Sequence, residues 1–375
     1  MPLQPGTKVP PDGYAAGDHS PVFALETDDG GIVYSHGDPL AGRPLLVLLC
    51  RAASAASGAL LRSIADAYAR LAQWEVHVLA ATSGSQTEID AFKGSLRLPF
   101  DVLLDASAEL LEIFTRPAAG PDDGVIVLID RNRRIVSVHQ AAGADAVPTV
   151  LAEMAALAAE PRVLKLDSHP PVLVLPRVLN AEDCESLVDI WYRPVKLWRS
   201  DGLTNSGYAN ETGDFKVRID SYGRTDQYVV RDPEIQSYID RRVARRVLPE
   251  IAKSFNVSPA YREDYRIACY DSAERGGLPR HRDNPTQTTR HRQFTISINL
   301  NAGEYEGGAL RFREYGDQLY DIERGTAIVW SCSLLHEVTD VTRGRRFMLG
   351  THIFSDLNAA KAAYSSVGTA AASGP

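Results

Sequence analysis

Two histidines and one aspartate stand in the sequence at a spacing that suits a metal ion. His281 and Asp283 lie two residues apart, and His336 follows 53 residues after Asp283. Side chains two apart in an extended segment point to the same side, so His281 and Asp283 can converge on one ion. Two imidazoles and one carboxylate form the facial triad of non-haem Fe(II) sites, which leaves the other metal positions open. We therefore expect a metal site at these three residues.

A fourth candidate residue is Arg346, which lies ten residues beyond His336. A guanidinium can pair bidentately with a carboxylate of a chelating cosubstrate. The neighbouring Arg345 is the alternative for this role. In a strand, Arg346 and His352 face the same side, so we expect His352 to line the same pocket without acting as a fourth metal ligand.

Each of these residues also has a plainer interpretation. His281 and Asp283 could be surface residues of an arginine-rich loop, and His336 could be a hydrogen-bonded core histidine. Arg346 could be an ordinary solvated charge in a turn. We assign Arg282 to the substrate pocket, since the arginines around the site would suit an anionic or acidic substrate. These arginines are Arg275, Arg280, Arg282, Arg290 and Arg292.

The segments around these residues have the pattern of short strands. In Gln293–Leu300, Phe294 and alternate apolar residues would face a core, whereas Thr295, Ser297 and Asn299 would face the other side. Thr326–Trp330 and Phe347–Phe354 are further apolar runs. Short strands joined by glycine turns, such as Gly307-Gly308 and Gly325, are typical of a double-sheet jelly roll, whose interior can hold a metal site.

The segment Ile267–Phe354 resembles the catalytic core of the prolyl 4-hydroxylase type of 2-oxoglutarate/Fe(II)-dependent dioxygenases. A His-x-Asp pair alone arises by chance in many chains, but its combination with a distal His-Glu-Val and a basic residue ten further on is specific. The matching motifs are Ala268-Cys269-Tyr270, His281-Arg282-Asp283-Asn284-Pro285, Gly307-Gly308-Ala309-Leu310-Arg311, Asp321-Ile322-Glu323, His336-Glu337-Val338 and Arg346-Phe347.

The resemblance implies a double-stranded β-helix dioxygenase domain with flanking helices. It implies Fe(II) held by His281, Asp283 and His336, and 2-oxoglutarate held by Arg346, with Tyr270, Asn299 or Arg345 as further contacts. O2 would be the oxidant, succinate and CO2 the coproducts, and ascorbate an allowed reductant. The implied reaction is hydroxylation of a prolyl or other amino-acid or peptide substrate. The alternative is a non-catalytic sensor or partner-docking module that binds metal and 2-oxoglutarate.

Residues 18–157 alternate between apolar strands and helical stretches, as α/β domains do. They resemble the thioredoxin-like fold in its peroxiredoxin form. The matching pieces are Gly17–Leu25, Leu98–Asp105 and Val125–Asp130. That family needs a low-pKa thiolate at a helix N-terminus. Here the turn Arg51–Ser57 has no cysteine: Ser54 or Ser57 stands near its place, and Cys50 comes too early. We expect a degenerate module without peroxidase activity, with a thiol peroxidase acting through Cys50 as the alternative.

The predicted organisation is a thioredoxin-like domain over 1–160, a proline-rich linker over 161–170, a dioxygenase domain over 171–357 and a flexible tail over 358–375. Asn180 is the expected N-cap of the first helix of the dioxygenase domain. The polar stretch Ser200–Gly223 is either a lid over the substrate or a mobile surface loop.

Composition excludes several function classes. The net charge of −8 argues against general nucleic-acid binding. No apolar run is long enough to cross a membrane, and the N-terminal residues do not match a signal peptide. The four cysteines show neither CxxC nor zinc spacing, so we expect free thiols in a cytoplasmic protein. The expected partners are a small-molecule, amino-acid or peptide substrate and a second copy of the chain through the first domain.

Overall fold

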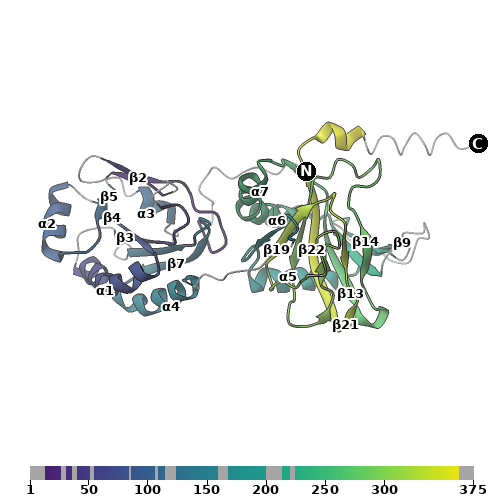
Figure 1. The fold of residues 1–375 in the computed structure, drawn as a ribbon, viewed down its shortest axis with the longest axis horizontal. Coiled ribbons are helices and arrows are strands. Elements are labelled where there is room, and N and C mark those ends of the chain that lie inside the picture. The colour runs from purple at the N-terminus through teal and green to yellow at the C-terminus, as the bar shows by residue number, and fades with distance from the viewer. Residues whose placement is uncertain are drawn as a thin grey trace, which may run out of the picture. The chain divides into compact units, whose positions relative to one another are not determined.

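The computed structural model describes residues 13–26, 31–35, 40–50, 55–83, 86–105, 109–114, 124–158, 168–199, 213–219 and 224–362. They fall into two compact units (Figure 1). The first unit comprises the described residues up to 158, and the second those from 168 onward. Most of the predicted linker lies outside the described residues.

The first unit is a seven-stranded mixed sheet with helices on its faces. Its strand order is β2-β1-β5-β4-β3-β6-β7, in which β3, β4 and β5 are parallel, β6 is antiparallel to β3, and β7 is antiparallel to β6. This is the strand arrangement of the thioredoxin-like fold, as predicted. The elements are β1 (Ala24–Glu26), β2 (Ile32–Tyr34), β3 (Leu45–Cys50), α1 (Ala55–Gln73), β4 (His77–Thr82), α2 (Gln86–Leu96), β5 (Val102–Leu104), α3 (Glu109–Phe114), β6 (Gly124–Ile129), β7 (Ile135–Ala142) and α4 (Val147–Leu157).

The central strand β3 has apolar side chains on both of its faces, and helices cover both faces of the sheet. All six of its residues are apolar and buried, which is typical of a parallel strand between two helical layers. Alternate residues pack into two different cores. Leu46 and Leu48 pack with α1 and α4, whereas Val47 and Leu49 pack with α3. The burial of both faces leaves Cys50, at the end of the strand, inside the first of these cores.

The second unit is built from two facing sheets, antiparallel except for the parallel pair β9 and β10, in a double-stranded β-helix or jelly roll. The larger sheet has the order β8-β19-β15-β22-β13-β11-β10-β9, with β12 on β22, and the smaller has the order β14-β20-β17-β18. Two further strands, β16 and β21, form a ribbon. The strands are β8 (Leu173–Leu175), β9 (Lys196–Arg199), β10 (Phe215–Ile219), β11 (Thr225–Val230), β12 (Tyr261–Arg262), β13 (Tyr265–Asp271), β14 (Leu278–His281), β15 (Phe294–Asn299), β16 (Glu306–Gly307), β17 (Leu310–Arg311), β18 (Leu319–Tyr320), β19 (Ala327–Ser331), β20 (His336–Val338), β21 (Val341–Arg343) and β22 (Arg345–Phe354).

Three helices cover the outer face of the larger sheet: α5 (Ala181–Trp191), α6 (Pro233–Arg246) and α7 (Leu248–Phe255). The alternation in β15 sets the two faces, as the sequence predicted. Ile296 and Ile298 pack under the helices, whereas Thr295 and Ser297 line a cavity between the two sheets. One face of the sheet therefore supplies the core, and the other supplies the site.

Three predicted boundaries lie in the second unit: the start of α5, the stretch Ser200–Gly223 and the C-terminal tail. Asn180 caps α5 in a reciprocal capping box with Asp183, as predicted. The stretch Ser200–Gly223 was predicted as one lid or loop, but Phe215–Ile219 forms strand β10 because it pairs with β11 and β9; the remainder is described only at residues 213–214. The predicted tail begins with helical residues 357–362, and its other residues lie outside the described part.

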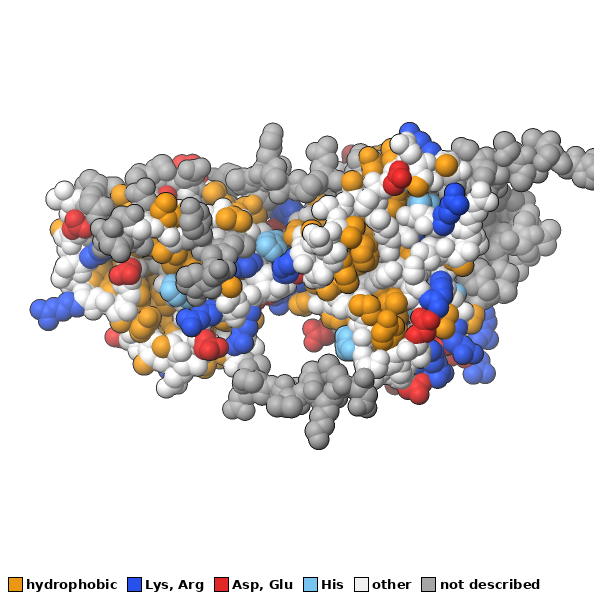
Figure 2. Space-filling model, turned by 45° about the horizontal axis from the view of Figure 1, so that its top comes forward, with side chains coloured by type: hydrophobic (Ala, Val, Ile, Leu, Met, Phe, Trp, Pro, Cys, Tyr) orange, Lys and Arg blue, Asp and Glu red, His pale blue; other side chains and the backbone are white. Residues whose placement is uncertain are grey.

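Acidic and basic side chains lie close together on the face shown in Figure 2, in both units. No helix among the described residues is long and apolar enough to span a bilayer.

Candidate active site

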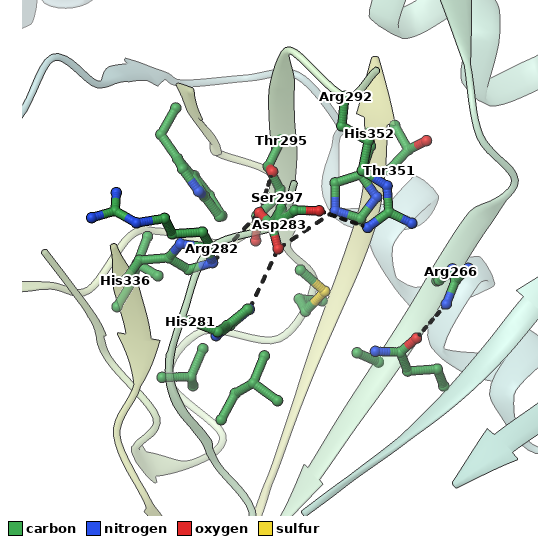
Figure 3. A pocket seen from close by; sticks show the side chains of 18 of the residues that line it. Arg266, His281, Arg282, Asp283, Arg292, Thr295, Ser297, His336, Thr351 and His352 are labelled. Carbon is green, nitrogen blue, oxygen red and sulfur yellow. Dashed lines mark hydrogen bonds and ion pairs between the residues drawn. The ribbon is translucent and has the colours of Figure 1, made fainter. Parts of the chain in front are cut away.

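The two strands β14 and β20 bring the three predicted metal ligands together. They are antiparallel neighbours in the smaller sheet, and His281 pairs directly with His336 across them. The Nε2 atoms of His281 and His336 lie 3.4 Å and 3.5 Å from the two carboxylate oxygens of Asp283. One donor atom from each of the three residues lies within 4.8 Å of the others. Figure 3 shows the two imidazoles and the carboxylate pointing toward one another.

Hydrogen bonds to backbone carbonyl oxygens fix the orientation of the two imidazole rings. The Nδ1 atom of His281 lies 2.8 Å from the Pro279 carbonyl oxygen, and that of His336 lies 2.9 Å from the Leu334 carbonyl oxygen. A carbonyl oxygen only accepts, so each Nδ1 must carry the proton. When such a ring is neutral, its Nε2 lone pair faces the centre of the cluster, which is the tautomer that a metal requires.

A series of connected polar side chains contacts the carboxylate of Asp283. The Thr295 hydroxyl donates to Asp283 Oδ2 at 2.5 Å, and His352 Nε2 lies 3.7 Å from Oδ1. The other nitrogen of His352 is 3.3 Å from Glu263, which also accepts two hydrogen bonds from Arg292 at 2.7 and 2.8 Å. The carboxylate of Asp283 is therefore held in one orientation by its neighbours.

The charges of this cluster change the proton affinities of its members. Burial alone would raise the pKa of Asp283, but the neighbouring imidazoles of His281, His352 and His336 hold it well below its usual range. Burial lowers the pKa of His281, yet the hydrogen bond and charge of Asp283 outweigh it and raise the net value. Burial lowers the pKa of His336. Asp283 is thus an ionised carboxylate between two imidazoles.

Arg346 reaches the same cavity from the larger sheet. It lies on β22 opposite Tyr270 of β13, and its guanidinium carbon is 5.4 Å from the Tyr270 ring centroid. The residue is only 6% exposed, and its Nη1 is buried without a hydrogen-bond partner among the described residues. Gly308, at φ +66°, lets the side chain pass, since a Cβ there would lie 2.8 Å from Arg346 Cδ. A buried guanidinium without a partner is costly, so the site is built for an anion.

The cavity between the sheets has a volume of about 520 Å³. The aromatic ring of Trp330 packs on His336 with ring centroids 5.0 Å apart and forms part of the wall. The two predicted pocket residues, His352 and Arg282, both line the cavity. Arg282 is more exposed and forms an ion pair with Glu314 at 2.5 Å.

Two predicted cosubstrate contacts do not reach the cavity. Asn299 follows the pocket-facing residues of β15 but is not among those that line it, because its amide donates to the Tyr305 hydroxyl at 2.6 Å and to the Ile322 carbonyl at 2.8 Å. Arg345 points the other way on β22, is exposed, and pairs with Asp271 at 2.6 Å. Of the two adjacent arginines, only Arg346 faces the site.

Glu263 is a neighbour of the site that the sequence did not single out, whereas Arg292 was named there only among the arginines around the site. Glu263 comes just before strand β13 and approaches the site only because β12 and β13 both pair with β22. Its sequence context carried no signal. Thr295 did carry one, because the alternation in β15 placed it on the side that faces away from the core.

The first unit has no comparable arrangement among its described residues. Cys50 is 3% exposed, and burial raises its pKa to about 11 although a hydrogen bond with Ser57 acts in the opposite direction. Ser57 lies in α1, and Ser54, the other residue considered for the place of the catalytic cysteine, lies outside the described residues. A thiol with this pKa is protonated at neutral pH, whereas nucleophilic cysteines are thiolates.

Comparisons with known proteins found matches to parts of the chain. Residues 265–354 match the family model of the 2OG-Fe(II) oxygenase superfamily. A PKHD-type hydroxylase from Cupriavidus pinatubonensis is 24% identical over 178 residues, which cover 47% of this chain and 75% of that protein. A solved prolyl-4-hydroxylase from Pseudomonas putida is 16% identical, covers 50% of this chain and 94% of its own, and has a TM-score of 0.36. A peroxidoxin from Mycobacterium tuberculosis is 19% identical, covers 38% of this chain and 97% of its own, and has a TM-score of 0.34.

The matched segment contains His281, Asp283, His336 and Arg346. Residues 265–354 form a 2OG-Fe(II) oxygenase domain, and the chain therefore carries an oxidoreductase domain of the dioxygenase class.

Proposed function

We propose that the second unit is an Fe(II)- and 2-oxoglutarate-dependent dioxygenase that hydroxylates a prolyl or other amino-acid or peptide substrate. The observation that carries the proposal is the convergence of two groups on one cavity. The donor atoms of His281, Asp283 and His336 lie within 4.8 Å of one another, and the buried Arg346 has an unpaired Nη1 at the same cavity. A metal and an anion are the two ligands that such groups would bind together.

The residues present fit both groups. Two neutral imidazoles and one carboxylate would hold Fe(II) on one face, and Arg346 would pair with the far carboxylate of 2-oxoglutarate. Tyr270, beneath the guanidinium, would keep it in place. When bound, iron and 2-oxoglutarate supply the oxidising chemistry that consumes O2 and releases succinate and CO2, with ascorbate as a reductant for the iron.

The chain's own residues position these groups and exclude water. The carbonyls of Pro279 and Leu334 orient the two imidazoles, and Thr295 orients the carboxylate. Trp330 shields His336 on one side. Hydroxylation is the favoured reaction because a related curated protein is named a hydroxylase. The prolyl substrate rests on the resemblance of the motifs.

Succinate formation from 2-oxoglutarate under air tests this proposal. The wild-type protein is assayed with Fe(II), without Fe(II), and beside the variant His336→Ala. We expect iron-dependent turnover that is lost in the variant, together with loss of Fe(II) binding in a chelator competition. Wild-type protein that binds neither iron nor 2-oxoglutarate would refute the assignment. Binding of both without turnover, across amino-acid and peptide substrates, would favour the sensor alternative.

We also infer that the first unit, proposed to span residues 1–160, has no peroxidase activity and serves docking, dimerisation or stability. The burial of Cys50 and its raised pKa support this inference. Consumption of hydrogen peroxide by wild-type protein and by Cys50→Ser tests it. Equal and negligible rates are expected, and a rate that disappears in the variant would show a thiol peroxidase.

A further inference from the structure

The arginines of the cavity differ in how their charge is balanced. Arg292 donates twice to Glu263, and Arg282 pairs with Glu314. Arg266 also lines the cavity, but its one partner among the described residues is the neutral amide of Gln227, whose oxygen accepts from Nη1 at 3.0 Å. Arg266 therefore adds an uncompensated positive charge to the wall.

The pairing of β13 with β22 places the side chains of Arg266 and Arg346 at different positions along the cavity. On β13 and β22, Arg266 pairs with Gly350, whereas Tyr270 pairs with Arg346. These two rungs are four residues apart, which is roughly 13 Å along the strand direction. The Arg346 guanidinium lies over the Tyr270 ring. The Arg266 guanidinium instead donates a hydrogen bond to Gln227 on the neighbouring strand β11 (Figure 3). The two guanidiniums are thus held at separate places.

The rung of Arg266 places polar groups on both sides of Gly350. Across Gly350 on β15 lies Ser297, whose hydroxyl has no hydrogen-bond partner among the described residues. Both Gly350 and Ser297 line the cavity, and the Met348 side chain packs over Gly350, since a Cβ there would lie 3.1 Å from Met348 Cε. The Arg266 guanidinium and the Ser297 hydroxyl therefore border the same part of the cavity wall.

Arg266 has unused donors at this position. A guanidinium carries five N–H groups, and Arg266 Nε is buried without an acceptor in the described part of the chain. A structural arginine in the same region looks different. Arg262 is fully buried and donates to both oxygens of Asp240, at 2.5 and 2.8 Å. Arg266 shares one feature with Arg346, a buried guanidinium nitrogen without an acceptor among the described residues, which an anion in the cavity would satisfy.

We propose that Arg266, positioned by Gln227 and assisted by Ser297, binds a carboxylate of the substrate that is oxidised. The substrate class is then a free amino acid or a carboxy-terminal residue, and not a residue inside a peptide. This inference rests on the proposed function, in which Arg346 already serves 2-oxoglutarate. A cavity of about 520 Å³ is in the range of sites for drug-sized ligands, so it has room for a second small acid beside the cosubstrate.

Calorimetric binding tests the proposal without turnover. Full-length protein is loaded with Mn(II) and N-oxalylglycine, a non-reacting analogue of 2-oxoglutarate. It is titrated with each genetically encoded amino acid and with each Gly-Xaa dipeptide, as the carboxylate and as the carboxamide. At least one carboxylate should bind roughly tenfold to a hundredfold more tightly than its amide, since hydrogen bonds to charged groups are the stronger ones. The amino-acid and dipeptide series distinguish a free amino acid from a peptide C-terminus.

Three variants locate the effect. Arg266→Met should bring the preferred carboxylate down to the affinity of its amide while N-oxalylglycine affinity stays within about twofold, and Arg266→Lys should restore part of the preference. Arg241→Met removes an exposed arginine on α6 that does not line the cavity and should leave the preference unchanged.

Several outcomes would overturn the assignment of Arg266. They are equal affinity for carboxylates and amides, no binding of any carboxylate probe, and an Arg266→Met variant that loses N-oxalylglycine instead. The series is repeated without metal and analogue. Failure of N-oxalylglycine to bind would refute the proposed function separately, while the preference of Arg266 would still be measured.

Discussion

Each unit places a side chain with potential chemistry at the end of a strand, and only one of the two is placed to react. Cys50 ends β3, a central strand buried on both faces, and its thiol is held protonated inside a core. His281 ends β14, a strand of the small sheet, and faces a cavity together with Asp283 and His336. Reactivity requires both convergence of groups and access for a ligand, and strand ends alone supply neither.

The largest expected effect tests this contrast directly. Asp283→Ala should lower succinate formation by roughly a thousandfold or more, because it removes a charged ligand of the metal. Cys50→Ser should leave the rate within about twofold, since its side chain lies in the other unit's core. Asp317→Ala, at a position 80% exposed in its side chain, controls for loss of an aspartate. Loss of turnover in Cys50→Ser would contradict the view that only the second unit takes part in the reaction.

A second effect separates two adjacent arginines. Arg346→Leu should raise the KM for 2-oxoglutarate by about a hundredfold, because it removes a buried charge-assisted pair. Arg345→Leu should change it by less than about twofold, because the exposed ion pair with Asp271 contributes little. Steady-state kinetics at saturating Fe(II) measures both. A larger effect of Arg345→Leu than of Arg346→Leu would show that 2-oxoglutarate binding had been assigned to the wrong arginine.

A smaller effect is expected from the groups behind the metal ligands. Thr295→Val removes the hydroxyl that donates to Asp283 and should weaken Mn(II) binding by roughly tenfold to a hundredfold, as loss of outer hydrogen bonds does. Thr288→Val is the matched control, because the Thr288 hydroxyl contacts Thr286 instead. Equal metal affinities in wild type and Thr295→Val would mean that Asp283 needs no such support.

The smallest expected effect is on stability in acid. Burial would raise the pKa of Glu263, but hydrogen bonds and charges from His352 and Arg292 lower it far below its usual value of 4.5. A depressed carboxyl pKa stabilises the folded state above the unfolded pKa, and this contribution fades as pH falls. In Glu263→Gln, the unfolding temperature of the second unit should fall less steeply below about pH 5 than in wild type. Identical slopes would contradict this, and the transition of the first unit serves as the internal reference.

Much of the site could be predicted from sequence because its parts are short motifs with fixed side-chain directions. The pairing of His281 with Asp283 needed only the twofold period of an extended segment, whereas the choice of Arg346 over Arg345 came from the resemblance to the family's motif. Asn299 shows the limit of that period. It lies on the correct face of β15, but Tyr305 and Ile322 hold its amide, and those contacts come from loops. Glu263 could not be predicted, because its approach depends on pairing between strands far apart in the chain.

The glycine beside the cosubstrate arginine gives the fold a diagnostic position. Gly308 adopts a left-handed conformation, and any Cβ there would collide with Arg346 Cδ and Val341. A side chain at this point would therefore displace the guanidinium even if Arg346 itself were retained. Under the proposed function, chains that keep the two histidines and the aspartate but replace this glycine are expected to bind metal and to hold 2-oxoglutarate more weakly.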